Sequence, residues 1–591
     1  MNKYIQLWTG RFRDKRSRIC LMVFAVLAVM VTAAICLKVR NIYAPIPLLR
    51  NQILIAVAIV AVGLSFFLAV QLDFRQFKVG RAILLALLIL VCVQAVSANF
   101  LVKINTNVML GSVAKTTWNG HRIAWLLFLI MAIYLAVICV FGRDKKFTAE
   151  RFFLVSVVPL SVAYLILMLP GSVPDTKIHF LASYRLSNIV LGEEPWVGRM
   201  DDINFYDEIA NCENPDMRDI TAVLSNLHLK AENTELAPWP EPMEHMEFYS
   251  VFCYLPQVLG MSLGRLLGLG SVPMIYLGRL FMLLSYILAC FHAIKRTPVG
   301  KFLFAAIPLL PMSLMLSSAI SYDPLVLVAT LNFLACSLWL CQEPDSRTAL
   351  AECMAWAFLV GAVKGGGYLI LLPVVLMFWD GKKRRSVTNI GAVVGASLVS
   401  VVLFDVILPA GSKLFQFGGE TDKLSASFAF QEPLHYVSML VETYVRQLDG
   451  LMINMGGTHL ALLEVTVPCV IIVGLMLVMG VYSIYEKDNM QLRNRDKQIF
   501  TLVVFLELFL TPVMLLSWTT VGSEVIDGLQ GRYYLPVLPL IVMVFTKFKL
   551  HDAAAGATEE QNLEIRESCY KVYALLSCIS VYYMMRLYLT R

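Results

Sequence analysis

An aspartate and a histidine, Asp175 and His179, follow the apolar run 152–169 at a spacing of four residues. Residues four apart share one face of a helix, so the pair would stand together where a membrane helix meets water. A positioned carboxylate can remove the proton of a hydroxyl as a new bond forms, which makes Asp175 a candidate catalytic base. His179 could orient that carboxylate, donate to a phosphate oxygen or share the proton transfer.

Both residues also have a structural interpretation. Asp175 could cap a helix that begins near Thr176, because an acidic side chain satisfies the free N–H groups of a first turn. His179 could be a packed residue of an amphipathic helix. The spacing of the pair alone does not separate these interpretations from catalysis.

Three basic residues at the edges of apolar runs could stabilise the negative charge of a phosphate leaving group. Arg532 precedes Tyr533 and carries a fork of donors that matches phosphate. Lys364 stands before three glycines between two short apolar runs, a setting in which an ionisable residue suggests function. Arg279 lies near the start of another run. The plainer interpretations are snorkelling at a helix end and a glycine-rich turn.

Acidic residues outside the Asp175 motif extend the candidate site. Asp323 lies between Tyr322 and Pro324, so it could pair with one of the cations, contact a sugar or cap a helix. The polar segment that follows residue 169 adds the acidic groups Asp201-Asp202, Glu193-Glu194 and Glu244 with Glu247. A divalent cation such as Mg²⁺ or Mn²⁺ could use their oxygens. Solvated loop charge is the plainer interpretation, and no metal ligand is assigned.

The composition is that of a membrane protein. The chain is 58% hydrophobic and 15% charged, with a mean hydropathy of +0.70, whereas soluble domains average about 25% charged residues. Its net charge of +7 says little about nucleic acid, because the basic residues cluster at the ends of apolar runs. Most of the 13 cysteines fall inside those runs and are expected to be packing residues. Cys212 and Cys253 could pair.

The apolar runs predict an all-α polytopic protein with about 14–15 transmembrane helices. The pair 353–363 and 368–379 could be two half-helices or one broken helix. Segment 249–270 and residues 434–455 are expected to lie at the membrane interface. The predicted spans are 19–37, 53–70, 82–101, 123–141, 152–169, 274–294, 302–318, 325–341, 353–363, 368–379, 388–408, 464–485, 499–518, 533–546 and 569–588.

The runs also predict a domain division and an orientation. We expect a four-span module at 1–151, a membrane core at 152–546 that includes an extracytoplasmic loop 170–273, and a cytoplasmic connector with the last helix at 547–591. Basic clusters such as residues 11–18 and 382–385 mark the cytoplasmic side. The N-terminus is therefore expected to be cytoplasmic, and loops 170–248, 409–463 and 519–532 to lie outside.

Three groups of motifs resemble one bacterial membrane-protein family. They are Pro174-Asp175 with His179; Tyr254-Leu255-Pro256-Gln257 with Tyr276-Leu277-Gly278-Arg279; and Pro311-Met312-Ser313 with Ser321-Tyr322-Asp323 and Gln530-Gly531-Arg532-Tyr533. In this order they are similar to the "domain of unknown function 2142" family over roughly 150–546. One departure is Thr176, where family members commonly have a second acidic residue.

That family in turn looks like the GT-C glycosyltransferases, and the resemblance implies a function. It implies a GT-C-like helical bundle, a polyprenyl-phosphate sugar donor, a cell-surface glycan or glycolipid acceptor, inversion at the sugar carbon, and an active site outside the bacterial cytoplasmic membrane. Asp175 and His179 would then be catalytic. Arg532, Lys364 and Arg279 would bind the lipid phosphate, and Asp323, Tyr322, Gln530 and Tyr533 the substrate.

Two other classes of function stay open at this point. A transporter or lipid-linked sugar flippase would also carry broken helices and charges within the membrane, as at Lys364. A non-catalytic protein of envelope polysaccharide assembly is the third class. Replacement of Asp175 by asparagine separates them, because only an enzyme should lose turnover while it still folds and binds lipid.

Overall fold

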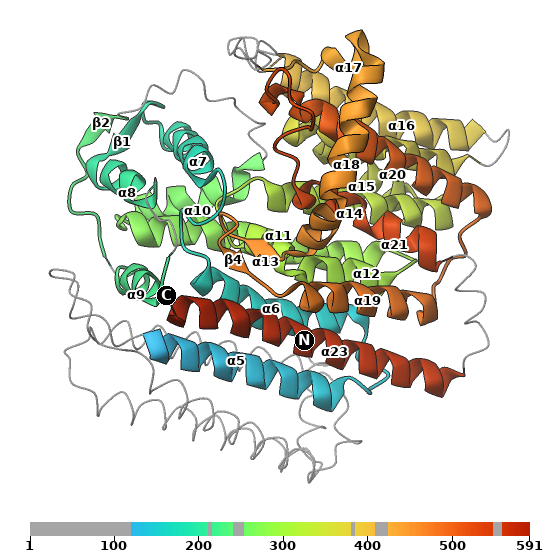
Figure 1. The fold of residues 1–591 in the computed structure, drawn as a ribbon, viewed down its shortest axis with the longest axis horizontal. Coiled ribbons are helices and arrows are strands. Elements are labelled where there is room, and N and C mark those ends of the chain that lie inside the picture. Colours follow the sequence, from blue (N-terminus) through green and yellow to red (C-terminus); the bar gives the residue numbers. More distant parts are fainter. Residues whose placement is uncertain are drawn as a thin grey trace. The chain divides into compact units, whose positions relative to one another are not determined.

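The computed structural model describes residues 120–210, 215–227, 229–239, 253–379, 384–407, 423–547 and 558–590 (Figure 1). About three quarters of these residues are helical, and the β structure within them is confined to two short antiparallel pairs and isolated bridges. The prediction of an all-α polytopic membrane protein is confirmed. The predicted spans 19–37, 53–70 and 82–101 lie outside the described residues, as do Cys212, Glu244 and Glu247.

Seven described helices contain stretches long and apolar enough to cross a membrane. They are α5 (Gly120–Phe141), α6 (Ala149–Leu167), α11 (Ser271–Arg296), α14 (Asp323–Gln342), α16 (Arg384–Val401) with the π-helical turn η7 (Val402–Ile407), α20 (Asn494–Met514) with η8 (Leu515–Trp518), and α23 (Glu559–Thr590). Shorter apolar helices are η6 (Lys364–Phe378), α19 (Cys469–Tyr485), and η9 (Gly531–Val537) continued by α21 (Leu538–Thr546).

Some predicted spans are broken or short, for identifiable reasons. The run predicted as one span at 302–318 forms three pieces: α12 (Lys301–Ala306), η5 (Ile307–Leu309) and α13 (Pro311–Ser317). Pro308 and Pro311 lack backbone donors and interrupt the helix there. The predicted pair 353–363 and 368–379 is α15 (Arg347–Ala362) followed by η6. The first three residues of η6, Lys364, Gly365 and Gly366, all have left-handed backbone and form the break.

The structure divides into two compact units. The first takes the described residues within Met1–Leu169, Asn214–Leu229 and Leu563–Arg591. Its helices α5, α6, α9 (Met217–Ser225) and α23 include an aromatic core in which Phe152 stacks on Tyr570 with 4.3 Å between ring centroids. The second unit takes Pro170–Glu213 and Lys230–Asn562. These units reflect packing alone, and the predicted division at 151 and 546 stays a prediction.

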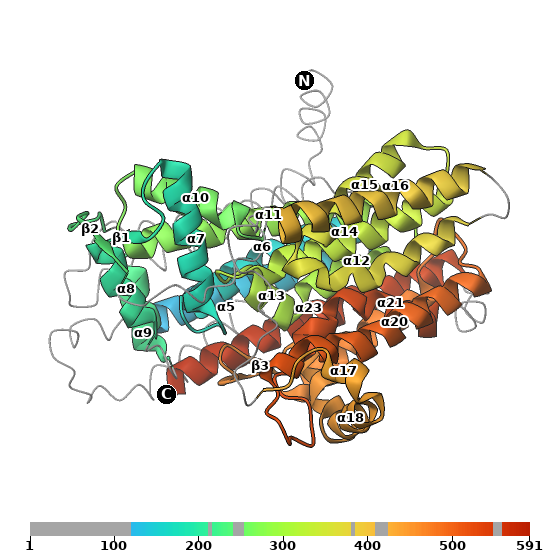
Figure 2. The ribbon, with the colours of Figure 1, turned by 90° about the horizontal axis from the view of Figure 1, so that it is seen from above.

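Within the second unit, α14 is the buried element that positions the candidate site. It packs between α11 and α15, and almost all of its side chains are buried. Helices α15 and α16 lie side by side on one flank (Figure 2), and α20 packs against η6 and α21. Because α14 is held along its length, the residues at its start have a fixed position.

The segment after residue 169 forms a small helical layer. It contains α7 (Thr176–Leu191), β1 (Val197–Arg199), α8 (Met200–Ala210), β2 (Leu236–Pro238) and α10 (Leu255–Leu266), and β1 pairs antiparallel with β2. Side-chain hydrogen bonds join α10 to α7, including Gln257 to Ser183 at 2.9 Å and Arg265 to Asn188 at 2.6 Å. The 12 residues of α10 span about 18 Å, too short for a hydrocarbon core of about 30 Å.

The opposite side of α10 packs closely on α11. A β-carbon at Gly260 would lie 2.4 Å from the carbonyl oxygen of Leu277, so the glycine is required by this contact. The outward stripe of α10 carries exposed leucines, Leu255, Leu259, Leu263 and Leu266. A short helix with one apolar outer stripe is what the interfacial interpretation of 249–270 expects.

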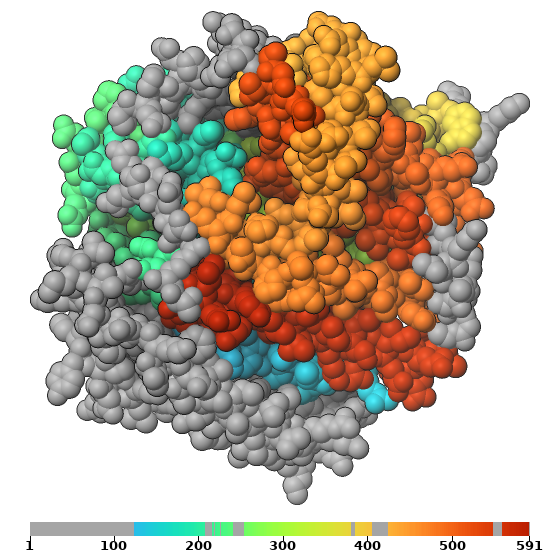
Figure 3. All heavy atoms as spheres, in the orientation of Figure 1, coloured from blue at the N-terminus to red at the C-terminus, as the bar shows by residue number. Residues whose placement is uncertain are grey.

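Helix α18 (Pro433–Gly456) is a second amphipathic element, preceded by α17 (Phe428–Gln431) and followed by β3 (His459–Leu460) and β4 (Val465–Thr466). It lies on the face of the molecule shown in Figure 3. Its exposed apolar side chains recur at helical spacing, at Leu434, Val437, Val441, Val445, Leu448 and Met452. The opposite side of α18 packs against η9, which carries Arg532.

Candidate active site

Asp175 precedes α7 in an unusual backbone conformation. Its φ is 61° and its ψ is 11°, in the left-handed region, which costs a non-glycine residue about 1–3 kcal/mol. Asp175 stands at the N-cap position, yet its side chain forms no capping hydrogen bond. The carboxylate is 53% exposed. The structure therefore does not support the capping interpretation, and it leaves the carboxylate accessible.

Arg532 joins Asp175 to Asp323. Its Nη2 lies 3.4 Å from Asp175 Oδ2, and its Nε lies 3.6 Å from Asp323 Oδ2. The arginine side chain is only 8% exposed, so the aspartates compensate a largely buried cation. Asp175 and Arg532 are 357 residues apart in the chain, and only the fold brings them together.

The glycine of the Gln-Gly-Arg-Tyr motif explains how Arg532 reaches this position. A β-carbon at Gly531 would lie 2.3 Å from the carbonyl oxygen of Leu451 and 2.5 Å from the amide nitrogen of Met455. Only glycine therefore lets η9 approach the backbone of α18 this closely. Gln530 is half-buried just before η9, in extended backbone.

His179 lies on the inner side of the cluster, among aromatic side chains. Its Nδ1 forms a 2.9 Å hydrogen bond with the hydroxyl of Tyr254, and its ring packs edge-on against Tyr322 at 4.8 Å. Burial lowers the pKa of His179 to about 4, an effect that the charges of Asp323 and Asp175 oppose. The imidazole is therefore neutral near pH 7. A neutral ring can share a proton or donate one hydrogen bond, but it supplies no positive charge to a phosphate.

Lys364 is a second cation of the cluster, and aromatic rings surround it. Its Nζ lies 4.2 Å from the ring centroid of Tyr533, 5.6 Å from that of Tyr322 and 6.0 Å from that of Tyr368. The hydroxyl of Tyr368 in turn donates to the carbonyl of Tyr533 at 3.2 Å. In the described part of the chain, Lys364 forms no ion pair with a carboxylate. It is the cation of this cluster whose charge is least compensated by contact.

Arg279, the third predicted phosphate ligand, is fully buried elsewhere in the second unit. Its Nε donates to the carbonyl of Ser318, and its guanidinium lies 4.6 Å from the ring of Tyr276. Ser318 directly follows α13, a few residues before Tyr322 and Asp323. These contacts fasten the turn that leads to the start of α14, so they point to positioning more directly than to phosphate binding.

Two features of the site escaped the sequence prediction. Tyr254 and Tyr368 contact the predicted site residues, but neither was assigned a role; Tyr368 stands four residues after Lys364, and that spacing was the available signal. Glu507, buried within α20, interacts electrostatically with Lys364 and accepts a 2.8 Å hydrogen bond from Thr511. An acidic residue inside a membrane helix is itself a functional signal.

Three of the described loop acids form hydrogen bonds or ion pairs within the layer around α7. Asp202 is fully buried and forms a 2.6 Å ion pair with Arg199, while Asp201 accepts from the backbone N–H of Glu232 at 2.7 Å. Glu193 pairs with Arg265. These contacts stabilise the layer around α7 and favour a structural interpretation over the Mg²⁺ or Mn²⁺ site considered from the sequence.

The starts of two helices add to the electrostatics of the site. Helix α7 begins after Asp175, and α14 begins at Asp323. The N-terminus of a helix carries partial positive charge and free N–H groups, which favour an anion. With Lys364 and Arg532, these ends give the cluster the capacity to bind an anionic group beside an accessible carboxylate.

Comparison with known proteins identifies one family. The family model described as "Predicted membrane protein (DUF2142)" matches residues 160–541, a range that contains every residue assigned to the candidate site. No curated protein and no solved structure matches the chain.

Proposed function

The chain belongs to the DUF2142 family of predicted membrane proteins, and we propose that it is a glycosyltransferase of the membrane. It would take a sugar from a polyprenyl-phosphate donor and transfer it to a cell-surface glycan or glycolipid. The site would face the outer side of the bacterial cytoplasmic membrane, as the distribution of basic residues predicts.

The observation that carries the proposal is the Asp175–Arg532–Asp323 cluster. It joins an accessible carboxylate, which makes no capping hydrogen bond, to a largely buried guanidinium. In the proposed reaction Asp175 removes the proton of an acceptor hydroxyl while its oxygen bonds to the anomeric carbon of the sugar. The bond between that carbon and the phosphate oxygen breaks, and the lipid phosphate keeps the electron pair.

The developing charge on the phosphate needs a cation that the resting site does not already neutralise. Arg532 is shared by two aspartates, whereas Lys364 forms no ion pair among the described residues and lies against aromatic rings. We therefore assign the larger share of phosphate binding to Lys364. Arg532 holds the two carboxylates in place and contributes to the field that acts on the leaving group.

The test is donor consumption by the purified protein in nanodiscs. Wild-type protein, Asp175→Asn and Asp527→Asn would be incubated with a panel of polyprenyl-phosphate sugars and acceptor glycans, followed by mass spectrometry. Asp527 is a matched control, because it is an exposed carboxylate of the loop before Arg532 and no contact places it in the cluster. The proposal expects transfer by the wild type and by Asp527→Asn, and its loss in Asp175→Asn.

Other results would favour the other classes of function. The left-handed break at Lys364, Gly365 and Gly366 is the feature that a transporter or flippase would use. Movement of a lipid-linked sugar across the membrane without a new glycosidic bond would replace the enzyme proposal with that one. Lipid binding without transfer or transport, unchanged by Asp175→Asn, would indicate an assembly protein.

A further inference from the structure

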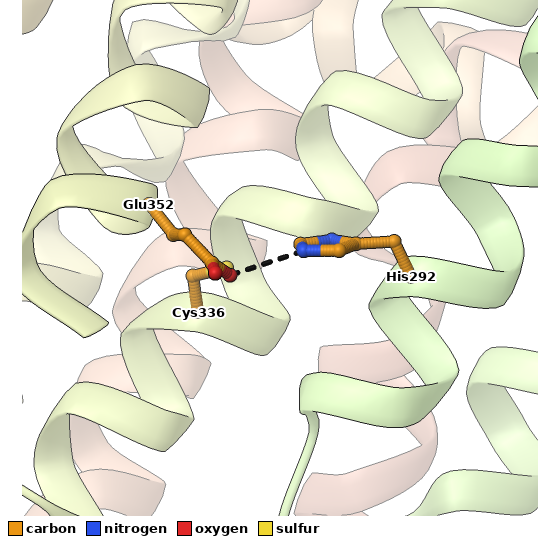
Figure 4. Close-up of side chains that lie close together, drawn as sticks. All are labelled: His292, Cys336 and Glu352. Carbon is orange, nitrogen blue, oxygen red and sulfur yellow. Dashed lines mark hydrogen bonds and ion pairs between the residues drawn. The ribbon is translucent and has the colours of Figure 1, made fainter. Parts of the chain in front are cut away.

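A second polar cluster joins three neighbouring helices of the same unit. It consists of His292 on α11, Cys336 on α14 and Glu352 on α15 (Figure 4). One potential ligand atom from each residue lies within 4.8 Å of the others. Cys336 is 13 residues beyond Asp323, about 20 Å along α14, so this cluster is separate from the candidate active site.

The hydrogen bonds of His292 leave one ring nitrogen turned toward the cluster. The amide group of Asn332 donates to the backbone carbonyls of Ala289 and Val328, at 2.9 and 2.8 Å, so its oxygen is the acceptor. This oxygen lies 2.7 Å from His292 Nδ1, which must therefore carry the proton. The lone pair of a neutral ring is then at Nε2, as in histidines that bind a metal and donate their other N–H to an amide or carboxylate.

Glu352 is oriented in a corresponding way. Arg296 donates to its Oε1, and its Oε2 lies 3.0 Å from His292 Nε2. Stacking on Trp339, with 4.3 Å between the guanidinium and the ring, helps to hold Arg296. The Nε–H of Arg296 also donates to His292 Nε2, in a long hydrogen bond of 3.4 Å. The nitrogen and the carboxylate oxygen still lie 3.0 Å apart, where a proton or a metal ion could bridge them.

Cys336 supplies a third donor atom. Its side chain is completely buried, and within the described residues its thiol makes no hydrogen bond. Figure 4 shows the sulfur beside the carboxylate of Glu352, on the side that faces His292. An imidazole nitrogen, a thiolate and a carboxylate oxygen together form a ligand set that suits Zn²⁺.

We propose that His292, Cys336 and Glu352 bind a Zn²⁺ ion that ties α11, α14 and α15 together. The ligand atoms of a tetrahedral zinc site lie roughly 3.5 Å apart, which small side-chain rotations would reach from the present positions. On binding, the Cys336 thiol releases its proton to water, so a thiolate, a carboxylate and the dication sum to zero charge. Arg296 keeps its hydrogen bond to Oε1 and so orients the carboxylate.

The role of such an ion would be structural and would not depend on the glycosyl transfer proposed above. It would fix α14, whose first residues are Asp323 and Pro324, against its two neighbours. A water molecule would complete the tetrahedron, because the three residues leave one position open.

The test measures metal directly in the full-length protein, with any affinity tag removed. Wild type, Cys336→Ser and Cys353→Ser would be dialysed against buffered micromolar Zn²⁺, and bound metal measured by mass spectrometry. Cys353 is the matched control: it is a buried cysteine of α15 whose sulfur lies 3.6 Å from the Ser337 hydroxyl, outside the cluster. A parallel sample with Co²⁺ would be examined for the near-ultraviolet charge-transfer band of a thiolate ligand.

The proposal expects one zinc per chain in the wild type and in Cys353→Ser, and binding at least about 10-fold weaker in Cys336→Ser. It also expects the cobalt–thiolate band in the first two proteins alone. Thermal unfolding of all three proteins would confirm that they are folded.

Absence of stoichiometric metal and of the band in the wild type would overturn the proposal. The same holds for equal zinc binding by Cys336→Ser. In either case His292 and Glu352 would be bridged by a proton.

Discussion

The cluster around Arg532 and the cluster around His292 use the same residue types in different ways. Each combines an arginine, a histidine and at least one carboxylate. In the first, Asp175 is half exposed and the histidine bonds to a tyrosine hydroxyl. In the second, the histidine faces the carboxylate directly and a thiol completes the group. An accessible carboxylate favours chemistry on a substrate, whereas donor atoms that converge from three helices favour an ion that joins those helices.

The largest difference between the two clusters is expected in the rate of sugar transfer, when one carboxylate of each cluster is changed to an amide. Asp175→Asn should lower the rate of sugar transfer by roughly 100- to 10,000-fold, because the base is removed. Glu352→Gln should leave the rate within a few-fold of wild type while it weakens zinc binding. Steady-state kinetics and metal content of both variants check this. Equal losses of transfer would mean that the two clusters are not distinct in function.

Removal of the two arginines should affect stability unequally. Arg532→Met leaves Asp175 and Asp323 without their shared cation, which should destabilise the protein by about 3 kcal/mol. Arg296→Met should lower the free energy of unfolding by less, because Glu352 still has His292 as a partner at 3.0 Å. Denaturant or thermal unfolding in one detergent compares them. A larger cost for Arg296→Met would contradict this view of the second cluster.

Lys364→Met should weaken the binding of polyprenyl phosphate by about 10- to 100-fold, since one charge-assisted contact is lost. The aromatic cage of Tyr322, Tyr368 and Tyr533 should stay intact, because methionine has a similar shape. Lys295→Met is a suitable control: it removes a basic residue at the end of α11, outside both clusters. Titration with polyprenyl phosphate measures the change in affinity. An unchanged affinity would assign phosphate binding to Arg532.

The smallest predicted effect is the pH dependence due to His179. Its folded pKa of about 4 lies below the ordinary value near 6.5, so the unfolded chain binds a proton first as pH falls. Stability contributed by His179 is present above pH 6.5 and is lost as the pH falls toward 4, by about 1 kcal/mol at pH 5.5. His179→Gln should show a correspondingly smaller loss between pH 7 and 5.5 in unfolding experiments. An equal loss in both proteins would place His179 in a more solvated environment.

Much of the fold followed from hydropathy alone. Long apolar runs without proline, such as those that became α11 and α14, were located to within a few residues, because burial and helical hydrogen bonding favour the same segment. The prediction of one span at 302–318 was wrong, because hydropathy takes no account of the backbone donors that Pro308 and Pro311 lack.

The candidate site could be predicted in part from the sequence. Sequence motifs selected Asp175, Asp323, Arg532 and Lys364, and the structure brings these together from segments up to 357 residues apart. It does not place Arg279 in the same group of contacts, because a carbonyl and a ring engage that side chain. The His292 cluster was not predicted, since its residues share no local spacing and meet only when three helices pack.

The most direct test of the central claim is the release of polyprenyl phosphate in a single turnover, with donor and acceptor saturating. Wild type and Asp175→Asn would be compared after their donor affinities have been measured. We predict donor affinities within about three-fold and a rate at least 100-fold lower in Asp175→Asn, as expected for loss of a general base. Equal rates would show that Asp175 does not act as the base and would remove the basis of the proposed mechanism.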